Sequence, residues 1–218
     1  MWHIFDKGGP VMYPLLACSI IALSVVIERA IFWLKLRLQS QPSLVHEILE
    51  LSRRGDWESI KNKTVHTKDY IIKILVSGIL HKEFSMIKAM EAAAADEIKH
   101  MRRFMGVLDT MITVAPLLGI FGTVLGIISS FEVLGSAGIE HPQEVTAGIA
   151  QALITTAAGL GIAILSVFPY NYFNSCVENA AVLIEKYATS LEIVFEKLTQ
   201  PGGQNYAEVE HESPTART

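Results

Sequence analysis

The sequence predicts an all-α integral membrane protein with three transmembrane helices, the second and third extended into long cytoplasmic helices. Three segments without Asp, Glu, Lys or Arg support this prediction; residues 8–27, 110–131 and 145–177 are 20, 22 and 33 residues long. A helix needs about 20 apolar residues to cross a hydrocarbon core of ~30 Å. The composition agrees, because 50% apolar and 18% charged residues and a mean hydropathy of +0.36 argue against a soluble enzyme.

Lys and Arg are concentrated between the first two spans, and this bias predicts the orientation. Fourteen of the eighteen lie from Arg29 to Arg103, whereas the loop between spans two and three carries only acidic charges. Basic loops stay in the cytoplasm, so we expect a periplasmic N-terminus and a cytoplasmic C-terminus. The three spans are expected at residues 10–34, 109–131 and 145–175. On the periplasmic side lie the N-terminus at 1–9 and the loop at 132–144. On the cytoplasmic side lie a helical segment at 35–108, a helix at 176–199 and a disordered tail at 200–218.

The first span is predicted to be a retained helix rather than a cleaved signal. No small-residue cleavage motif follows it, and Glu28 and Arg29 end it. Cys18 lies inside this span and Cys176 at the far end of the third. Neither has a nearby Cys or His partner, so we interpret both as buried small residues rather than disulfide or zinc ligands.

The cytoplasmic segment is expected to be helical. Apolar residues at helical spacing predict a helix over residues 43–52 and another starting near Lys68. Between them, after Arg54-Gly55-Asp56, we expect a short helix over residues 57–63. No Pro or Gly occurs from Phe84 until Gly106, which predicts a helix that runs unbroken into span two. The third span should likewise continue over residues 178–198 until Pro201-Gly202-Gly203.

Small residues form one face on each of the last two spans. Lipid supplies no hydrophobic drive between helices, so such faces are typical of close helix packing. At 100° per residue, the five positions on span two fall within a stripe of about 80°. The two faces are Pro116, Gly119, Thr123, Gly126 and Ser130 on span two, and Gly148, Ala152, Thr155, Thr156, Gly159 and Ala163 on span three.

The threonines on these faces have two interpretations. Thr123, Thr155 and Thr156 lie in mid-span, and a membrane threonine often only bonds back to its own helix. If the two faces met around a pore, the same hydroxyls would offer ligands to an ion or to water. Gln151 must find hydrogen-bond partners when buried. It either joins packed helices through these bonds or lies beside a pore.

The three spans contain no Asp, Glu, Lys, Arg or His between their charged ends. A proton relay normally needs an ionisable group at depth in the membrane. We therefore expect that the chain either conducts nothing or depends on a partner that supplies the titratable residue.

Three motifs in order resemble those of a known family. Residues 9–19 (GPVMYPLLACS), leading to Glu28-Arg29, are similar to the first span of ExbB and TolQ proteins. Residues 115–127 (APLLGIFGTVLGI) resemble their second span, and residues 148–160 (GIAQALITTAAGL), followed by Pro169-Tyr170-Asn171, resemble the third. The chain is identified as a member of the MotA/TolQ/ExbB proton channel family, on its three-span ExbB/TolQ branch.

The resemblance implies a motor subunit of the bacterial inner membrane. Such subunits form a homo-oligomeric ring, usually a pentamer, around the single-span helices of an ExbD/TolR-type dimer, whose aspartate takes up and releases the proton. The proton motive force then drives work on a TonB- or TolA-like periplasmic protein, as in protein transport or envelope maintenance. By this resemblance Thr123 and Thr156 face the pore. From the two small-residue faces we expect Thr155 and Gln151 beside the ion pathway, and helix packing by Pro116, Gly119, Gly126, Gly148 and Gly159.

One position departs from the family pattern. ExbB and TolQ proteins usually have glutamate where this chain has Gln151. If that glutamate relays protons, this chain must do without the relay or carry a different ion; if the glutamate only positions its neighbours, Gln151 can substitute for it. The threonine pair leaves sodium open as the ion, with the proton favoured.

The remaining alternatives belong to other classes. A membrane scaffold that conducts nothing would also use helix-packing faces. An enzyme is not expected, because the sequence contains no nucleophile–base pair, metal-ligand cluster or phosphate loop. We expect no cofactor or metal beyond the transported ion, contact with membrane lipids and no nucleic-acid partner, since no basic patch accompanies the net charge of −4.

Overall fold

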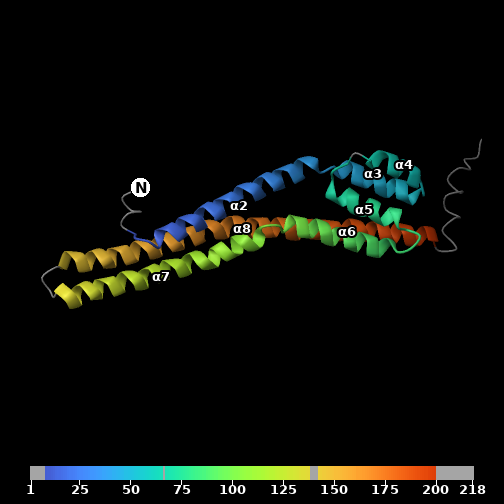
Figure 1. Ribbon diagram of the computed structural model, residues 1–218. Helices are drawn as coiled ribbons and strands as arrows, with labels where there is room; N and C mark the ends of the chain where they lie inside the picture. The colour runs from blue at the N-terminus through green and yellow to red at the C-terminus, as the bar shows by residue number, and fades with distance from the viewer. Residues whose placement is uncertain (1–7, 66, 138–141, 200–218) are drawn as a thin grey trace, which may run out of the picture. The chain divides into compact units, whose positions relative to one another are not determined.

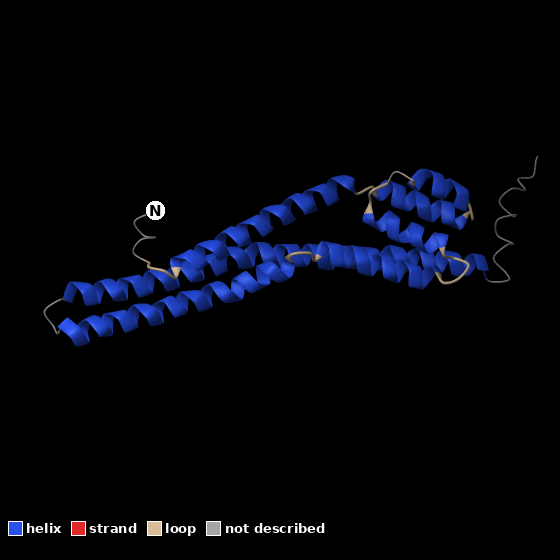
Figure 2. Ribbon diagram, in the orientation of Figure 1, coloured by secondary structure: helices blue, strands red, loops and turns tan. Residues whose placement is uncertain are grey.

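The computed structural model describes residues 8–65, 67–137 and 142–199, and these residues form helices and turns without a strand (Figures 1 and 2). Three of the helices are long and apolar enough to cross a membrane: Met12–Gln39, Met105–Gly135 and Val145–Leu198. The all-α membrane fold class is confirmed. In chain order the helices are α2 (Met12–Gln39), α3 (Pro42–Arg53), α4 (Trp57–Thr64), α5 (Tyr70–Leu80), α6 (Met86–Met101), α7 (Met105–Ala137) and α8 (Pro142–Thr199).

The chain divides into two compact units. The first unit comprises Met1–Phe32 and Arg102–Ser175, and the second comprises Trp33–Met101 and Cys176–Thr218. Helices α2 and α8 each contribute to both units. All of α7 belongs to the first unit, and α3 to α6 belong to the second.

The first unit packs α7 and α8 side by side, with the start of α2 against them (Figure 1). One small core joins Val11, Met12 and Leu15 to Ala115. A second joins Ala22 and Val25 to Leu108, with Tyr170 of α8 packed against them. These cores use only part of each helix surface, which is the arrangement expected where lipid covers the rest.

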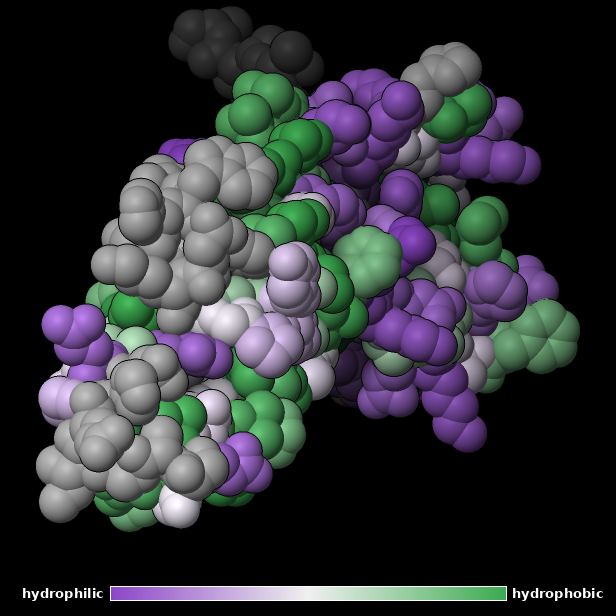
Figure 3. Space-filling model, turned by 60° about the vertical axis from the view of Figure 1, so that its left-hand side comes forward, coloured by the Kyte–Doolittle hydropathy of each residue, from purple (hydrophilic) through white to green (hydrophobic). Residues whose placement is uncertain are grey.

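The other faces of these helices carry large apolar side chains that this chain leaves exposed. The space-filling view shows hydrophobic side chains at the surface (Figure 3). A helix that is apolar on all sides belongs in a hydrophobic surrounding. Among the exposed side chains of the first unit are Ile20, Leu23, Ile120, Phe121, Leu160 and Leu165.

The second unit is a bundle around α5. Ile71, Ile72, Ile74 and Leu75 of this helix are all buried. Asp69 stabilises its start: the carboxylate accepts hydrogen bonds from the backbone N–H of Ile71 (2.8 Å) and, across the bundle, of Gln41 at the start of α3 (2.7 Å). One side chain therefore satisfies donors at two helix N-termini.

The second unit also includes the end of α8. The rings of His46 and Tyr187 meet edge to face at 6.0 Å between centroids, and those of Trp57 and Phe195 at 6.4 Å. The predicted continuation of the third span into a long helix is thus confirmed, since α8 is continuous to Thr199. The tail predicted over residues 200–218 lies outside the described residues.

The prediction of an unbroken helix from Phe84 into span two is wrong. Helix α6 ends at Met101 and α7 begins at Met105, and Phe104 between them has a left-handed backbone with φ of 63°. The sequence has no helix breaker here, so the reason is tertiary. The ring of Phe104 lies 5.7 Å from the guanidinium of the buried Arg29, so the residue that interrupts the helix is also the one that contacts Arg29 of α2.

Candidate functional site

The side chains of Thr123 on α7 and Thr156 on α8 meet between the second and third spans. Their hydroxyls hydrogen-bond to each other. Each hydroxyl oxygen also lies 3.1 Å from the backbone carbonyl oxygen of Gly119, which can accept a hydrogen bond from either of them. Both side chains are partly exposed. The two hydroxyls, one carbonyl and an apolar surrounding form a polar but uncharged site.

This site has more acceptors than donors. Each threonine hydroxyl has one proton to donate, and the oxygens within reach are the partner hydroxyl, Gly119 O and, at 3.5 Å from Thr123, Ala152 O. The two protons can therefore take up alternative arrangements without any ionised group. In such a network an oxygen lone pair can bind a cation, or a hydroxyl can hydrogen-bond to a water molecule, and the bonds within the site can form again afterwards.

Glycines bring the two helices close enough for this contact. A Cβ on Gly119 would lie 3.0 Å from the carbonyl oxygen of Thr155, and one on Gly126 would lie 2.8 Å from that of Gly148. A Cβ on Gly159 would lie 3.1 Å from the Cα of Gly119. Backbone atoms cannot move aside as a flexible side chain can, so these glycines lie in the α7–α8 contact.

The remaining small residues on the two faces also lie at or near this contact. Ser130 donates to the carbonyl oxygens of Gly126 (2.9 Å) and of Val145 on α8 (3.1 Å). Pro116 is half-buried inside α7, next to the fully buried Ala115. Pro116 has no N–H, so it leaves the carbonyl four residues earlier without its helical donor.

Thr155 is placed differently from its neighbour Thr156. Its side chain is fully buried, and its hydroxyl donates to Ala152 O of its own helix at 2.8 Å. A Cβ on Gly122 would lie only 2.7 Å from the Cβ of Thr155. Thr155 thus fills the space over Gly122 inside the helix contact and does not reach the surface of the chain.

Gln151 contacts the start of the first span. Its amide nitrogen occupies the place where Gly9 would carry a Cβ, and Gly9 has a left-handed φ of +69°. Only glycine takes up that backbone conformation without strain. Gln151 therefore packs on the turn that leads into α2, within the first unit.

Two features of this unit escaped the sequence analysis. Gly122 lies inside the motif of residues 115–127, but only the structure shows its role, which is to leave room for the Thr155 side chain. Arg29 is 1% exposed, whereas the sequence predicts only that it ends the first span. Its guanidinium donates to Glu28 (Nη2 to Oε1, 2.7 Å) and lies 4.4 Å from the ring centroid of Phe32. In the sequence, the signal for a partner of the Arg29 side chain is Phe32, three positions later on the same helix.

Among the described residues, no group of three or more His, Cys, Asp or Glu side chains could hold a metal ion. Cys18 is buried and Cys176 half-buried, and both are free thiols. The chemistry that the described site offers is hydrogen bonding by hydroxyl and carbonyl oxygens.

Three apolar helices and a polar contact between two of them define a multi-pass helical membrane protein. Comparison with known proteins agrees. The profile of the MotA/TolQ/ExbB proton channel family matches residues 66–186. A putative biopolymer transport protein, ExbB-like 3 of Synechocystis sp., is 34% identical over 208 residues, which cover 92% of this chain and 98% of that protein.

Two further relatives agree with this match. ExbB-like 1 of the same organism is 34% identical over 201 residues, 89% of this chain and 78% of the relative. The Tol-Pal system protein TolQ of Haemophilus influenzae is 37% identical over 109 residues, 48% of each chain. This chain belongs to the MotA/TolQ/ExbB proton channel family, on its ExbB/TolQ branch.

Proposed function

We propose that this protein is the ring-forming subunit of an ion-driven motor in the bacterial inner membrane. The ring, a pentamer by family resemblance, surrounds a single-span dimer of the ExbD/TolR type. Proton flow through the assembly drives mechanical work on a periplasmic or outer-membrane transport or envelope system through a TonB- or TolA-like protein. The N-terminus is periplasmic and the C-terminus cytoplasmic. Membership of the family and the three membrane-length helices support this proposal.

The observation that carries the proposal is the hydroxyl pair of Thr123 and Thr156. It lies in mid-span, is partly exposed, and has protons that can be shared among several oxygens. The spans have no ionisable side chain of their own between the charged ends. A carboxyl on the partner helix would then supply the titration, and the hydroxyls would bind the ion or the carboxyl during transfer.

Thr155 has another part in this proposal. Its full burial gives it a packing role under the pore-facing pair. Gln151 holds the turn before α2 and keeps the hydrogen-bonding capacity of the usual glutamate without its charge.

The experiment is ion uptake into liposomes that contain this protein and a small single-span protein of the ExbD/TolR type. Thr156→Val keeps the shape of the side chain and removes its hydroxyl. Uptake driven by a proton gradient should fall by about tenfold or more, which corresponds to a barrier rise of ~1.4 kcal/mol. Thr113→Val is the matched control, because Thr113 is exposed on the same helix as Thr123 and donates to Asp109 O of its own turn.

Assembly must be measured on the same samples. The mass of the co-purified complex should correspond to a ring with two copies of the partner, in the wild type and in both variants. Replacing the proton gradient with a sodium gradient identifies the ion. Normal uptake by Thr156→Val would contradict the pore-facing role.

The second candidate function is a membrane scaffold that conducts nothing. It is favoured by the fact that both hydroxyls already have acceptors within the chain, as threonines that serve only packing do. A stable complex that lacks the single-span partner and takes up no ions would support the scaffold and contradict the motor.

A further inference from the structure

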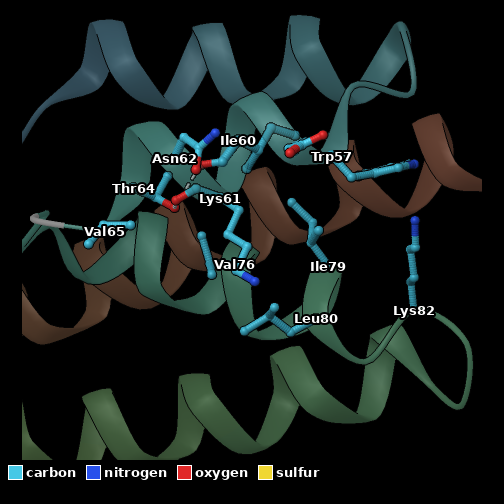
Figure 4. Close-up of a pocket in the computed structure, with 11 residues that line it drawn as sticks. Trp57, Ile60, Lys61, Asn62, Thr64, Val65, Val76, Ile79, Leu80 and Lys82 are labelled. Atoms are coloured by element: carbon cyan, nitrogen blue, oxygen red, sulfur yellow. Dashed lines mark hydrogen bonds between the residues drawn. The ribbon is translucent and has the colours of Figure 1, made fainter.

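The second unit has a groove between α4 and α5, with a volume of about 650 Å³ (Figure 4). Its floor is formed by Ile60 and Ile79, which are buried. Its rim carries Val65 and Leu80, which are 65% and 62% exposed. Large apolar side chains left open beside a groove are typical of a surface that binds another segment of chain.

The charges beside the groove favour an acidic occupant. Lys61 and Lys82 line it, together with one acidic residue, Glu58. At one end the Lys82 ammonium points toward Trp57 and lies 4.3 Å from its ring centroid (Figure 4). A segment that places apolar side chains on one face and acidic side chains beside them would match both the floor and the lysines.

The end of α8 lies beside this groove, within the same unit. The ring of Trp57, which lines the groove, contacts Phe195 of α8. The helix ends four residues later at Thr199, only about 6 Å further along its axis. Thr199, the last residue that the structure describes, therefore lies close to the Trp57 end of the groove.

The sequence of that segment fits the groove. Pro201-Gly202-Gly203 comes first, and then the apolar Tyr206 and Val209 lie among Glu208 and Glu210. Tyr206 and Val209 are three residues apart, so they share one face of a segment with three residues per turn, as in polyproline II. The seven residues that follow Thr199, up to and including Tyr206, span at most about 24 Å when extended. Helix α4, with eight residues, is only about 12 Å long, so Tyr206 and Val209 can reach any point along it.

We propose that residues 204–212 of this chain bind in its own α4–α5 groove, with Tyr206 and Val209 on the apolar floor and the glutamates beside Lys61 and Lys82. A short linker gives the segment an effective concentration in the millimolar range, so a weak contact is enough. The proposal does not depend on ion conduction.

Site-specific photocrosslinking of the full chain in membranes tests this contact. With p-benzoylphenylalanine in place of Tyr206, irradiation should crosslink the tail to tryptic peptides 64–68 or 74–82, which contain Val65 and Leu80. Leu80→Glu should lower this crosslink about fivefold, because it places a carboxylate on the apolar rim opposite an acidic segment. Phe84→Glu is the matched control, since Phe84 is 91% exposed and lies just after α5, outside the lining.

A charge exchange makes the test independent of the apolar rim. Lys61→Glu should also lower the crosslink several-fold, and adding Glu208→Lys with Glu210→Lys to the same chain should restore it. Crosslinks spread over the surface, or equal in Leu80→Glu and the wild type, would overturn the proposal. So would crosslinks between tagged and untagged chains in mixed samples, because they would place a neighbouring copy in the groove.

Discussion

Thr123 of α7 and Thr156 of α8 hydrogen-bond to each other through their hydroxyls, and both also reach the carbonyl oxygen of Gly119. The contact joins two membrane spans at a point where no ionisable side chain is present. It makes the two threonines one unit, because neither hydroxyl can be removed without changing the partners of the other. The effect of a threonine substitution on stability must therefore be measured separately from its effect on ion conduction.

The shared bond predicts that the two threonines are coupled in stability. Thr123→Val and Thr156→Val should each lower the free energy of unfolding by about 0.6–1 kcal/mol. The double variant should cost less than the sum of the two single ones, since either substitution alone already removes the hydrogen bond between the two hydroxyls. Denaturant unfolding in detergent measures the cycle, and a double effect equal to the sum of the singles would contradict the coupling.

The close approach of α7 and α8 predicts that Gly159 and Gly161 differ sharply. A Cβ on Gly159 would clash with the carbonyl oxygen of Ala115, whereas one on Gly161 would meet nothing within 4 Å. Gly159→Ala should lower stability by about 1–3 kcal/mol through overpacking. Gly161→Ala, on the same helix, should leave the thermal unfolding temperature unchanged or slightly raised. Equal unfolding temperatures for the two variants would show that the helices can separate at no cost.

The contact between Gln151 and Gly9 predicts that the amide can be replaced but the glycine cannot. Gln151→Glu keeps the length of the side chain and introduces the residue usual in ExbB and TolQ proteins, so ring assembly should be retained. Gly9→Ala should destabilise the first unit by about 1–2 kcal/mol, because its φ of +69° is strained for a residue with a Cβ. Native mass spectrometry and thermal unfolding check both outcomes. Loss of the ring in Gln151→Glu would show that the site cannot accept a carboxylate.

Tyr70 predicts a loss of stability in alkali. Burial, together with the neighbouring charge of Asp69, raises the pKa of Tyr70 from 10 to about 12. Below pH 10 the phenol is protonated in both states and its contribution is fully present. Between pH 10 and 12 the unfolded chain loses this proton first, so the stability of the folded state should fall by about 2–3 kcal/mol.

The comparison of Tyr70→Phe with the wild type isolates this effect. The phenylalanine variant should lack that part of the decline when unfolding is measured at several pH values across this range. Tyr172→Phe is the control, because the Tyr172 side chain is 63% exposed. A decline of the same steepness in Tyr70→Phe and the wild type would contradict the assignment to Tyr70.

The sequence alone determined the class of fold and the family. Charge-free segments of membrane length predict three spans, and the apolar spacing of residues 43–52 predicts the helix that the structure has as α3. These signals are local: the distance across a bilayer and the period of a helix depend on consecutive residues of one segment. The motifs around Gly119 and Gln151 are local in the same way, and they carried the family resemblance.

Only the tertiary structure decided how the site is arranged. Thr155 and Thr156 are neighbours in the sequence, but one is fully buried over Gly122 and the other reaches Thr123. Adjacent helical residues point about 100° apart, so the rotation of α8 against α7 assigns their roles. The break before α7 and the burial of Arg29 next to Phe104 likewise arise from contacts between distant segments. No breaker residue or hydrophobic period marks such contacts in the chain itself.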